Sequence, residues 1–171
     1  MKIIIQTRRM VIHEFDPAEY PLLINLYNNE KVTKYVSRHT DAENKKIFED
    51  TLNDYKNGIG LGRWGILNLA NDEFIGVCIL KPADSDTGHI ELGYVLDEPY
   101  WGLGLATELT KGLLKYGFTE KHLTEICACT DIENEASQNV LFKAGFTREG
   151  NVFWHGKDLP FFKIRHTHFN C

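Results

Sequence analysis

The sequence predicts an α/β fold in which helices pack on a mixed sheet. Apolar runs of strand length alternate along the chain with segments of helical spacing. At residues 97–104 a turn rich in glycine joins one such apolar run directly to a helical pattern. The chain has 171 residues, of which 43% are hydrophobic and 25% charged, as is ordinary for one soluble globular domain with its own core.

The N-terminal part is predicted to hold one strand and two helices. Residues 6–15 form the strand. A helix over residues 16–29 begins at Asp16, a preferred cap, and the proline that follows is tolerated in the first turn. Pro21 is expected either to delay this helix or to break it. The second helix, residues 41–58, closes on Gly58 as a left-handed cap.

The middle of the chain is predicted to hold a hairpin, a central strand and a long helix. Residues 62–69 and 73–81 read as antiparallel strands, and a turn at residues 84–88 leads to the central strand, 89–96. The helix of residues 104–118 follows. Its apolar residues recur at spacings of four, four and three, and they are Leu105, Leu109, Leu113 and Tyr116.

The C-terminal part is predicted to close the sheet. Residues 124–130 form a strand, and a short helix spans about 135–143, with Gly145 in the C′ position. Residues 147–154 and 160–169 are expected to form the final hairpin.

The glycine turn is the first candidate binding site. A helix that opens on Gly102 and Gly104 directs unpaired N–H groups, and the positive end of its dipole, at one spot that suits a phosphate. The alternative is an ordinary strand–turn–helix connection. No Gly-Lys-Ser/Thr follows, so the turn is not a P-loop, and it lacks the third glycine of the dinucleotide fingerprint.

Several motifs make the resemblance to a family specific. Trp101-Gly-Leu-Gly-Leu-Ala106 resembles the Q/R-x-x-G-x-G/A loop of the Gcn5-related N-acetyltransferase (GNAT) superfamily. Residues 100–108, Tyr-Trp-Gly-x-Gly-x-Ala-Thr-Glu, resemble its ribosomal-protein (RimJ/RimL-type) branch. Residues 134–137 and 140–146 are similar to that branch's Asn-x-x-Ser and Gly-Phe block, and residues 7–12 to its first strand.

The resemblance covers essentially the whole chain and implies a fold and an activity. It implies one N-acetyltransferase domain over residues 1–171, with a mixed, mostly antiparallel sheet, helices on both faces and a splayed central strand pair. It also implies acetyl-CoA as the donor and a primary amine as the acceptor, either a protein N-terminal α-amine or a small molecule. A non-catalytic module that binds CoA or a partner is the alternative, because Leu141 occupies the family's usual tyrosine position.

The resemblance also assigns the cofactor contacts. The phosphates would be held by the loop and first helical turn, namely Trp101, Gly102, Leu103, Gly104, Leu105, Ala106 and Thr107. The pantetheine arm would pair with the central strand as an added strand does, along Leu92, Gly93, Tyr94, Val95 and Leu96. Asn134 would contact the same arm, although an asparagine directly before a helix is also a preferred N-cap.

Glu91 is the first candidate for the general base. It projects from one face of an otherwise mostly apolar strand, and a partly buried carboxylate there could take up the amine proton through water. A solvent-facing glutamate is the alternative, and His89 and Glu149 are weaker candidates. Ser137 matches the serine of the branch and could protonate or bind the leaving sulfur, although a serine hydroxyl is a poor acid.

The remaining aromatic residues are expected to pack in the core or to line the binding pockets. Tyr94 and Tyr100 are interpreted as core or wall residues. The acceptor pocket would be formed by residues 28–40, the second helix and the closing hairpin. The aromatic and histidine side chains of those segments are Tyr35, His39, Phe153, Trp154 and Phe161.

Charge and composition exclude other classes. The net charge is −5 and no basic run is present, which argues against nucleic acid as the main ligand. No apolar run approaches a membrane span or a signal-peptide core, so we expect a cytoplasmic chain with reduced cysteines. His166 and His168 share a face of the last predicted strand, but only Cys171 is nearby, so no metal is expected. A homodimer is an open alternative to a monomer.

Overall fold

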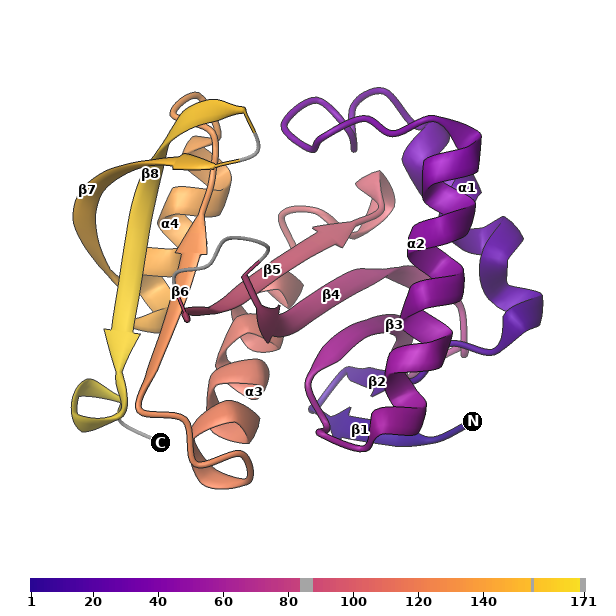
Figure 1. Cartoon of the computed structure of the whole chain (residues 1–171), viewed down its shortest axis with the longest axis horizontal. Coiled ribbons are helices and arrows are strands. Elements are labelled where there is room, and N and C mark those ends of the chain that lie inside the picture. Colours follow the sequence, from indigo (N-terminus) through magenta and orange to yellow (C-terminus); the bar gives the residue numbers. More distant parts are fainter. Residues whose placement is uncertain (84–87, 155, 170–171) are drawn as a thin grey trace.

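Eight strands form one sheet in the residues that the structure, a computed structural model, describes: 1–83, 88–154 and 156–169 (Figure 1). The strands are β1 (Ile3–Gln6), β2 (Met10–His13), β3 (Gly62–Asn68), β4 (Phe74–Pro82), β5 (Ile90–Leu96), β6 (Glu125–Cys129), β7 (Thr147–Trp154) and β8 (Lys157–Arg165). The α-helices are α1 (Tyr20–Asn28), α2 (Asp41–Asp54), α3 (Leu105–Thr119) and α4 (Glu135–Ala144). Neighbouring strands follow the order β1-β2-β3-β4-β5-β6-β8-β7, and only β5 and β6 run parallel among them. The mixed, mostly antiparallel α/β sheet is therefore confirmed.

Helices cover both faces of this sheet, as successive residues of β4 show. Val77 packs with Leu23 of α1 and Phe48 of α2. The next residue, Cys78, belongs to the cluster that contains the apolar side of α3. Because successive strand residues face opposite sides, α1 and α2 lie on one face and α3 on the other (Figure 1).

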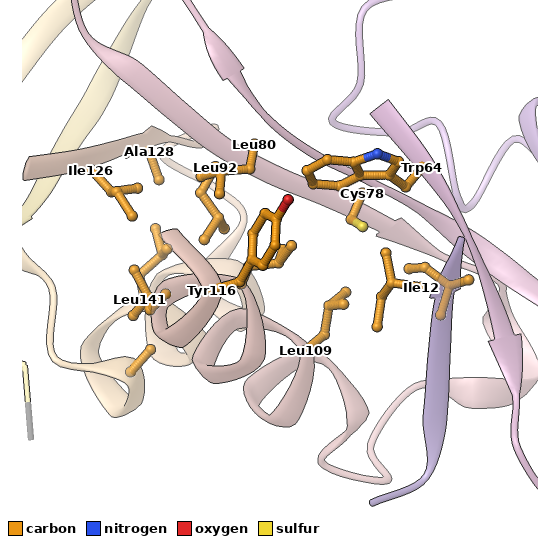
Figure 2. Close-up of a cluster of buried hydrophobic side chains, with 14 of the residues drawn as sticks. Ile12, Trp64, Cys78, Leu80, Leu92, Leu109, Tyr116, Ile126, Ala128 and Leu141 are labelled. Atoms are coloured by element: carbon orange, nitrogen blue, oxygen red, sulfur yellow. The ribbon is translucent and has the colours of Figure 1, made fainter. Parts of the chain in front are cut away.

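The larger core lies between α3 and the sheet (Figure 2). Leu109 and Leu113 are fully buried, and the Tyr116 ring meets Trp64 edge-on with 6.0 Å between ring centroids. The apolar face predicted for this helix from its spacing is therefore confirmed. Truncation of one such leucine to alanine typically costs about 2–5 kcal/mol, so this face anchors the helix that follows the glycine turn.

The helix boundaries follow from their caps. The Asp16 carboxylate accepts from the Ala18 amide at 2.9 Å, and a 3-10 turn, Pro17–Glu19, then runs into α1. The Thr40 hydroxyl caps α2 by accepting from the amide of the third helical residue, and Gly58 ends the following 3-10 turn with a φ of 70°. Both predicted starts and the glycine stop are thus confirmed.

Two predicted strands were wrong in extent. Of the strand expected over residues 6–15, only β2 is observed, and β1 before it was not predicted. A turn separates the two, in which the Thr7 amide donates to the Met10 carbonyl at 2.9 Å. The last strand ends at Arg165, and His166–His168 form a 3-10 helix instead. The turn expected at residues 84–88 falls mainly on 84–87, which lie outside the described residues.

The central strands separate beyond one paired position. β4 and β5 pair at seven positions, from Gly76↔Leu96 to Pro82↔Ile90. β5 and β6 pair only at Glu91↔Cys127. Past Glu91 the two strands run apart, as Figure 1 shows, which leaves the edge of β5 over residues 92–96 with no strand beside it. The splayed pair that the resemblance implied is confirmed.

Candidate active site

A cavity of about 1640 Å³ opens where β5 and β6 separate. One part of its wall is β5, the first turn of α3 and the first turns of α4. The other part comes from α1, α2 and residues 30–39. All of the predicted cofactor-binding and catalytic positions line this cavity except Leu103, whose side chain is 56% exposed. The topology therefore brings together residues from Leu23 to Leu159 around one cavity.

The glycine turn offers a row of free donors at one end of the cavity. Gly102 and Gly104 have φ values of 72° and 76°, a conformation that glycine adopts without strain. Gly104 is the N-cap of α3 and supplies no side-chain cap. In the part of the chain that the structure describes, the N–H groups of residues 102–107 donate to no protein acceptor. An anion is the ligand that such a helix terminus prefers.

Trp101 replaces the polar residue of the general motif and has a role of its own. Its indole Nε1 donates to the carbonyl of Leu96 at 2.7 Å. Leu96 ends β5, so this bond ties the glycine turn to the strand that precedes it. The ring is 46% exposed and lines the cavity.

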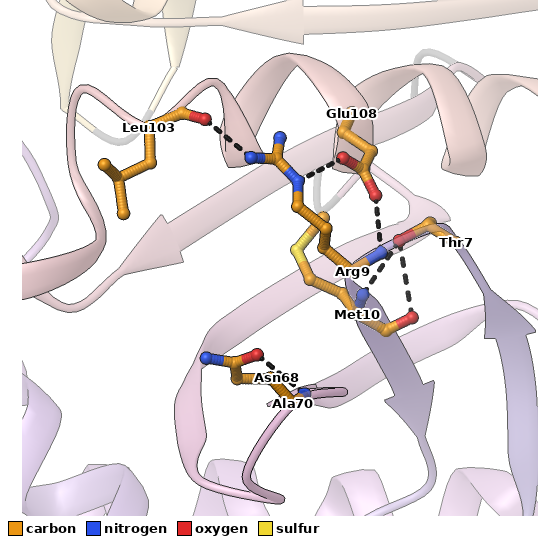
Figure 3. Close-up of polar contacts among 7 residues, drawn as sticks. All are labelled: Thr7, Arg9, Met10, Asn68, Ala70, Leu103 and Glu108. Atoms are coloured by element: carbon orange, nitrogen blue, oxygen red, sulfur yellow. Dashed lines mark hydrogen bonds and ion pairs between the residues drawn. The ribbon is translucent and has the colours of Figure 1, made fainter.

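A second set of contacts holds the glycine turn from the N-terminal side of the sheet (Figure 3). We call these contacts, which Arg9 makes with Glu108 and Leu103, the Arg9 brace. The Arg9 side chain donates through Nε to a Glu108 carboxylate oxygen at 2.7 Å and through Nη1 to the Leu103 carbonyl at 2.9 Å. The Arg9 amide donates to the other Glu108 oxygen at 2.9 Å. The sequence reasoning missed this brace, although Arg9 lies in the first-strand motif and Glu108 in the glycine-turn motif.

Asn134 and Ser137 lie at the start of α4, across the cavity from β5. The side-chain oxygen of Asn134 accepts from the Ser137 amide at 3.1 Å, so the N-cap role that the sequence left open is observed. The Ser137 side chain lies close to the hydroxyl of Tyr94, which projects from β5. Burial raises the pKa of Tyr94, and the neighbouring Ser137 side chain opposes the shift without cancelling it. Tyr94 is therefore a neutral hydroxyl at physiological pH, and it bridges the two walls.

Glu91 lies at the last point where β5 and β6 pair. It is 6% exposed, lines the cavity, and accepts from the Cys129 thiol at 3.5 Å. Lys81 of β4 lies directly opposite it. A carboxylate in this position is enclosed by the sheet and faces the space where the strands diverge.

The neighbouring cysteines are inert thiols. Burial, followed by the charge of Glu91, raises the pKa of Cys127 to about 12 and also raises the pKa of Cys129. A thiol of that kind is protonated at neutral pH and is not a nucleophile.

The weaker base candidates lie elsewhere. His89 is 3.6 Å from Glu125 and packs against Phe161, outside the cavity. Glu149 lies on exposed β7, with Arg165 at 3.3 Å. Neither reaches the place where β5 and β6 part, so the geometry favours Glu91 among the three carboxylate and imidazole candidates.

Only some of the side chains expected to form the acceptor pocket line the cavity. Tyr35 and His39 line the cavity, and the Tyr35 hydroxyl donates to the Glu133 carbonyl at 3.4 Å, which joins the loop after α1 to the segment before α4. Phe153 is 73% exposed, and Trp154 packs with Phe161 in a separate cluster. Those three aromatic residues of the closing hairpin do not line the cavity.

The two C-terminal histidines do not form a strand face. His166 stacks on Phe118 with 5.3 Å between ring centroids. Within residues 1–83, 88–154 and 156–169, no three His, Cys, Asp or Glu side chains are grouped so that they could share a metal ion. Over the same residues, no helix has the length and apolar character that crossing a membrane requires.

The comparisons with known proteins agree with this geometry. The family model of the acetyltransferase (GNAT) domain matches residues 9–147. A Bacillus licheniformis protein called uncharacterized N-acetyltransferase p20 is 30% identical over 146 residues, which cover 84% of this chain and 82% of that protein. The crystal structure of a GNAT-family acetyltransferase from Bacillus anthracis has a TM-score of 0.78 at 22% identity, over 94% of this chain and 97% of that one.

One further structure adds a ligand to the comparison. RimL, a ribosomal L7/L12 α-N-protein acetyltransferase solved in complex with coenzyme A, has a TM-score of 0.77 at 18% identity, over 96% of this chain and 98% of that one. At this level of identity the two structural likenesses show a shared fold.

Proposed function

The chain belongs to the acetyltransferase (GNAT) domain family, and from that premise we propose that it transfers an acetyl group from acetyl-CoA to a primary amine. The single observation that carries the proposal is the splayed β5–β6 pair. It leaves the edge of β5 free beside a helix terminus with free N–H groups. An extended pantetheine arm can pair with such an edge while its pyrophosphate meets the turn.

The residues that line the cavity fit the pyrophosphate, the pantetheine arm and the thioester of acetyl-CoA. The amides of residues 102–107 would hold the pyrophosphate, and the Thr107 hydroxyl adds a side-chain donor. The β5 edge over residues 92–96 would orient the arm, and Asn134 can serve it through the amide nitrogen while its oxygen caps α4. An N–H of β5 is the candidate for polarising the thioester carbonyl oxygen.

Glu91 is our candidate for the general base. It is enclosed, lines the cavity, and lies where β5 and β6 part. There it can take the amine proton directly or through one water, which typically contributes about 10²–10⁴-fold to the rate. The amine then attacks the thioester in a ternary complex, because the protonated thiols of Cys127 and Cys129 argue against an acyl-enzyme.

The Tyr94–Ser137 pair is our candidate for returning a proton to the leaving thiolate. Ser137 alone is a poor acid, and Leu141, at the family's usual tyrosine position, is buried in the core. Tyr94 reaches Ser137 from the opposite wall, so a phenol is still present at the end of the arm. This tyrosine comes from the central strand and not from α4, the helix that carries the usual one.

The acceptor class follows from similarity alone. The likeness to the RimJ/RimL-type branch favours a protein N-terminal α-amine in the cytoplasm, with small-molecule amines as the second class. A non-catalytic CoA-binding module of the same fold is the competing function.

Thiol release from acetyl-CoA across a panel of amines tests the proposal. The panel holds N-terminal peptides, polyamines, amino acids and aminoglycosides, with the product mass as confirmation. Release with one class that survives a chelator and cysteine alkylation supports a GNAT-type transfer. Tight acetyl-CoA binding with no release from any amine supports the module instead.

A further inference from the structure

Arg63 is a half-buried cation with no acidic partner among the residues that the structure describes. It lies on β3, lines the cavity, and donates through Nη1 to the Tyr27 hydroxyl of α1 at 3.1 Å. No carboxylate in the described part of the chain forms an ion pair with its guanidinium, whereas Arg9 and Arg165 each have one. A guanidinium that lines a cavity and is bonded through Nη1 to one neutral hydroxyl still has donors available for an anion.

The Arg63 and Tyr27 side chains together offer several hydrogen-bond donors. A guanidinium carries five N–H donors, and the bond to Tyr27 uses one of them. Because the Tyr27 oxygen accepts from Arg63, its hydrogen is left to donate to something else. The Tyr55 hydroxyl donates to the Arg63 carbonyl and so fixes the backbone from which the guanidinium extends.

The sheet register places this cation on the same face as the candidate base. Arg63 pairs with Ile79 of β4, and Ile79 pairs with Gly93 of β5, so all three share one face. Glu91 lies two residues before Gly93 and therefore faces the same way. Two strand spacings separate the backbones of β3 and β5 by about 10 Å, so an amine held at β5 would need a linker of several bonds to carry a carboxylate to the Arg63 side chain.

We propose that Arg63 and Tyr27 form an anion subsite in the acceptor half of the cavity, which selects amines that carry a carboxylate several bonds from the reacting nitrogen. The inference rests on the proposed acetyl transfer and deepens it. A planar guanidinium fork matches a carboxylate in shape and in charge. Lysines such as Lys81 also line the cavity, but α2 brings two carboxylates, Asp50 and Asp54, to it, so a singly charged carboxylate is favoured over a doubly charged phosphate.

Matched acceptors isolate the carboxylate. 6-Aminohexanoate and 6-aminohexanamide share one chain and one amine and differ only in the charge of the far group. The wild-type protein is expected to prefer the acid by about 10-fold or more in kcat/KM, the range typical of a hydrogen bond to a charged group. The preference should lie in KM rather than in kcat, because the subsite binds and does not react.

Two variants and a control assign the preference to these side chains. Arg63→Gln should bring the acid-to-amide ratio close to one, and Tyr27→Phe, which keeps the ring packing, should lower it by a few-fold. Arg148→Gln removes an exposed arginine of β7 outside the cavity and should keep the wild-type ratio. The acetyl-CoA dissociation constant and the melting temperature of each variant exclude a folding defect. A wild-type ratio in Arg63→Gln would overturn the subsite.

A direct binding experiment tests the subsite even if no amine is acetylated. Saturation-transfer NMR with 6-aminohexanoate reports contact without turnover. Binding to the wild type that is lost in Arg63→Gln supports the subsite even though the proposed transfer has failed. Equal signals in both proteins, or no signal in either, refute it. Preference for a phosphate-bearing amine over the acid would correct the anion class and count against the proposal as stated.

Discussion

Arg9 and Glu108 lie 99 positions apart in the sequence, yet their side chains meet with 2.7 Å between Nε and Oε2. The same guanidinium holds the Leu103 carbonyl, so one ion pair fixes both the glycine turn and the first turn of α3. Burial by itself would raise the pKa of Glu108, but hydrogen bonds from Arg9 and Thr7 outweigh burial and lower the pKa. Glu108 is therefore charged at neutral pH and a full partner for the arginine.

The brace should matter for cofactor affinity. Arg9→Gln and Glu108→Gln should each weaken acetyl-CoA binding by about 3- to 10-fold, because each loosens the turn whose amides meet the pyrophosphate. The double variant should lose no more than the weaker-binding single variant, since both changes remove one interaction. Calorimetric titration measures all three. Lys2→Gln, which breaks the Lys2–Glu14 pair away from the cavity, is the matched control. Strictly additive losses would argue against a shared brace.

The contribution of the Arg9–Glu108 pair to stability should decrease at acidic pH. The folded-state pKa of Glu108 is lowered from its ordinary value of 4.5. Its contribution to stability is therefore complete above about pH 4.5 and is lost as the pH falls through the lower folded value. The difference in melting temperature between wild type and Glu108→Gln should be constant near neutral pH and shrink below pH 4.5. A difference that grows on acidification would contradict the assignment.

Gly104 should tolerate no side chain without loss of cofactor. Its φ of 76° costs an L-residue about 1–2 kcal/mol, and a Cβ there would lie 3.7 Å from Nη2 of Arg9. The branched methyls of Gly104→Val would crowd that guanidinium and the turn amides, so acetyl-CoA affinity should fall at least about 10-fold. Gly150→Val, also at positive φ but with open space around it, should show the strain in its melting temperature and keep the affinity.

The sequence was most informative where the pattern is local. Leu109 and Leu113 follow helical spacing and are fully buried, and Asp16 caps the segment that it was expected to start. Asn134 shows the limit of such reasoning. Its position before a helix fits a cap and its motif fits a cofactor contact, and one amide group can serve both roles through different atoms.

The missed features are all contacts between distant segments. Arg9 meets Glu108 only because β1 lies beside α3, and Tyr94 comes close to Ser137 only because β5 and the start of α4 line the same cavity. Single-sequence periodicity reports which face a residue takes, but not which segment that face meets.

Glu91→Gln tests the base. The substitution keeps size and hydrogen-bonding capacity but cannot take a proton, so kcat should fall by about 10²-fold or more while the acetyl-CoA dissociation constant changes little. The dependence of kcat on pH should differ between the variant and the wild type. Glu149→Gln, on exposed β7, is the control and should keep both the rate and the profile. A variant profile that matches the wild type would remove Glu91 from the role.

Tyr94→Phe tests the proton donor. The ring stays packed against the core, and only the hydroxyl that meets Ser137 is lost. If that hydroxyl serves the leaving thiolate, kcat should fall at least about 10-fold with nearly unchanged acetyl-CoA affinity, and Ser137→Ala should add little on top of it, because the pair acts as one unit. The matched control is Tyr116→Phe, which loses a hydroxyl bonded to the Gly60 carbonyl far from the thioester end and should change stability rather than rate. Equal losses of kcat in the two variants would mean that Tyr94 acts through packing, and water would then be the donor.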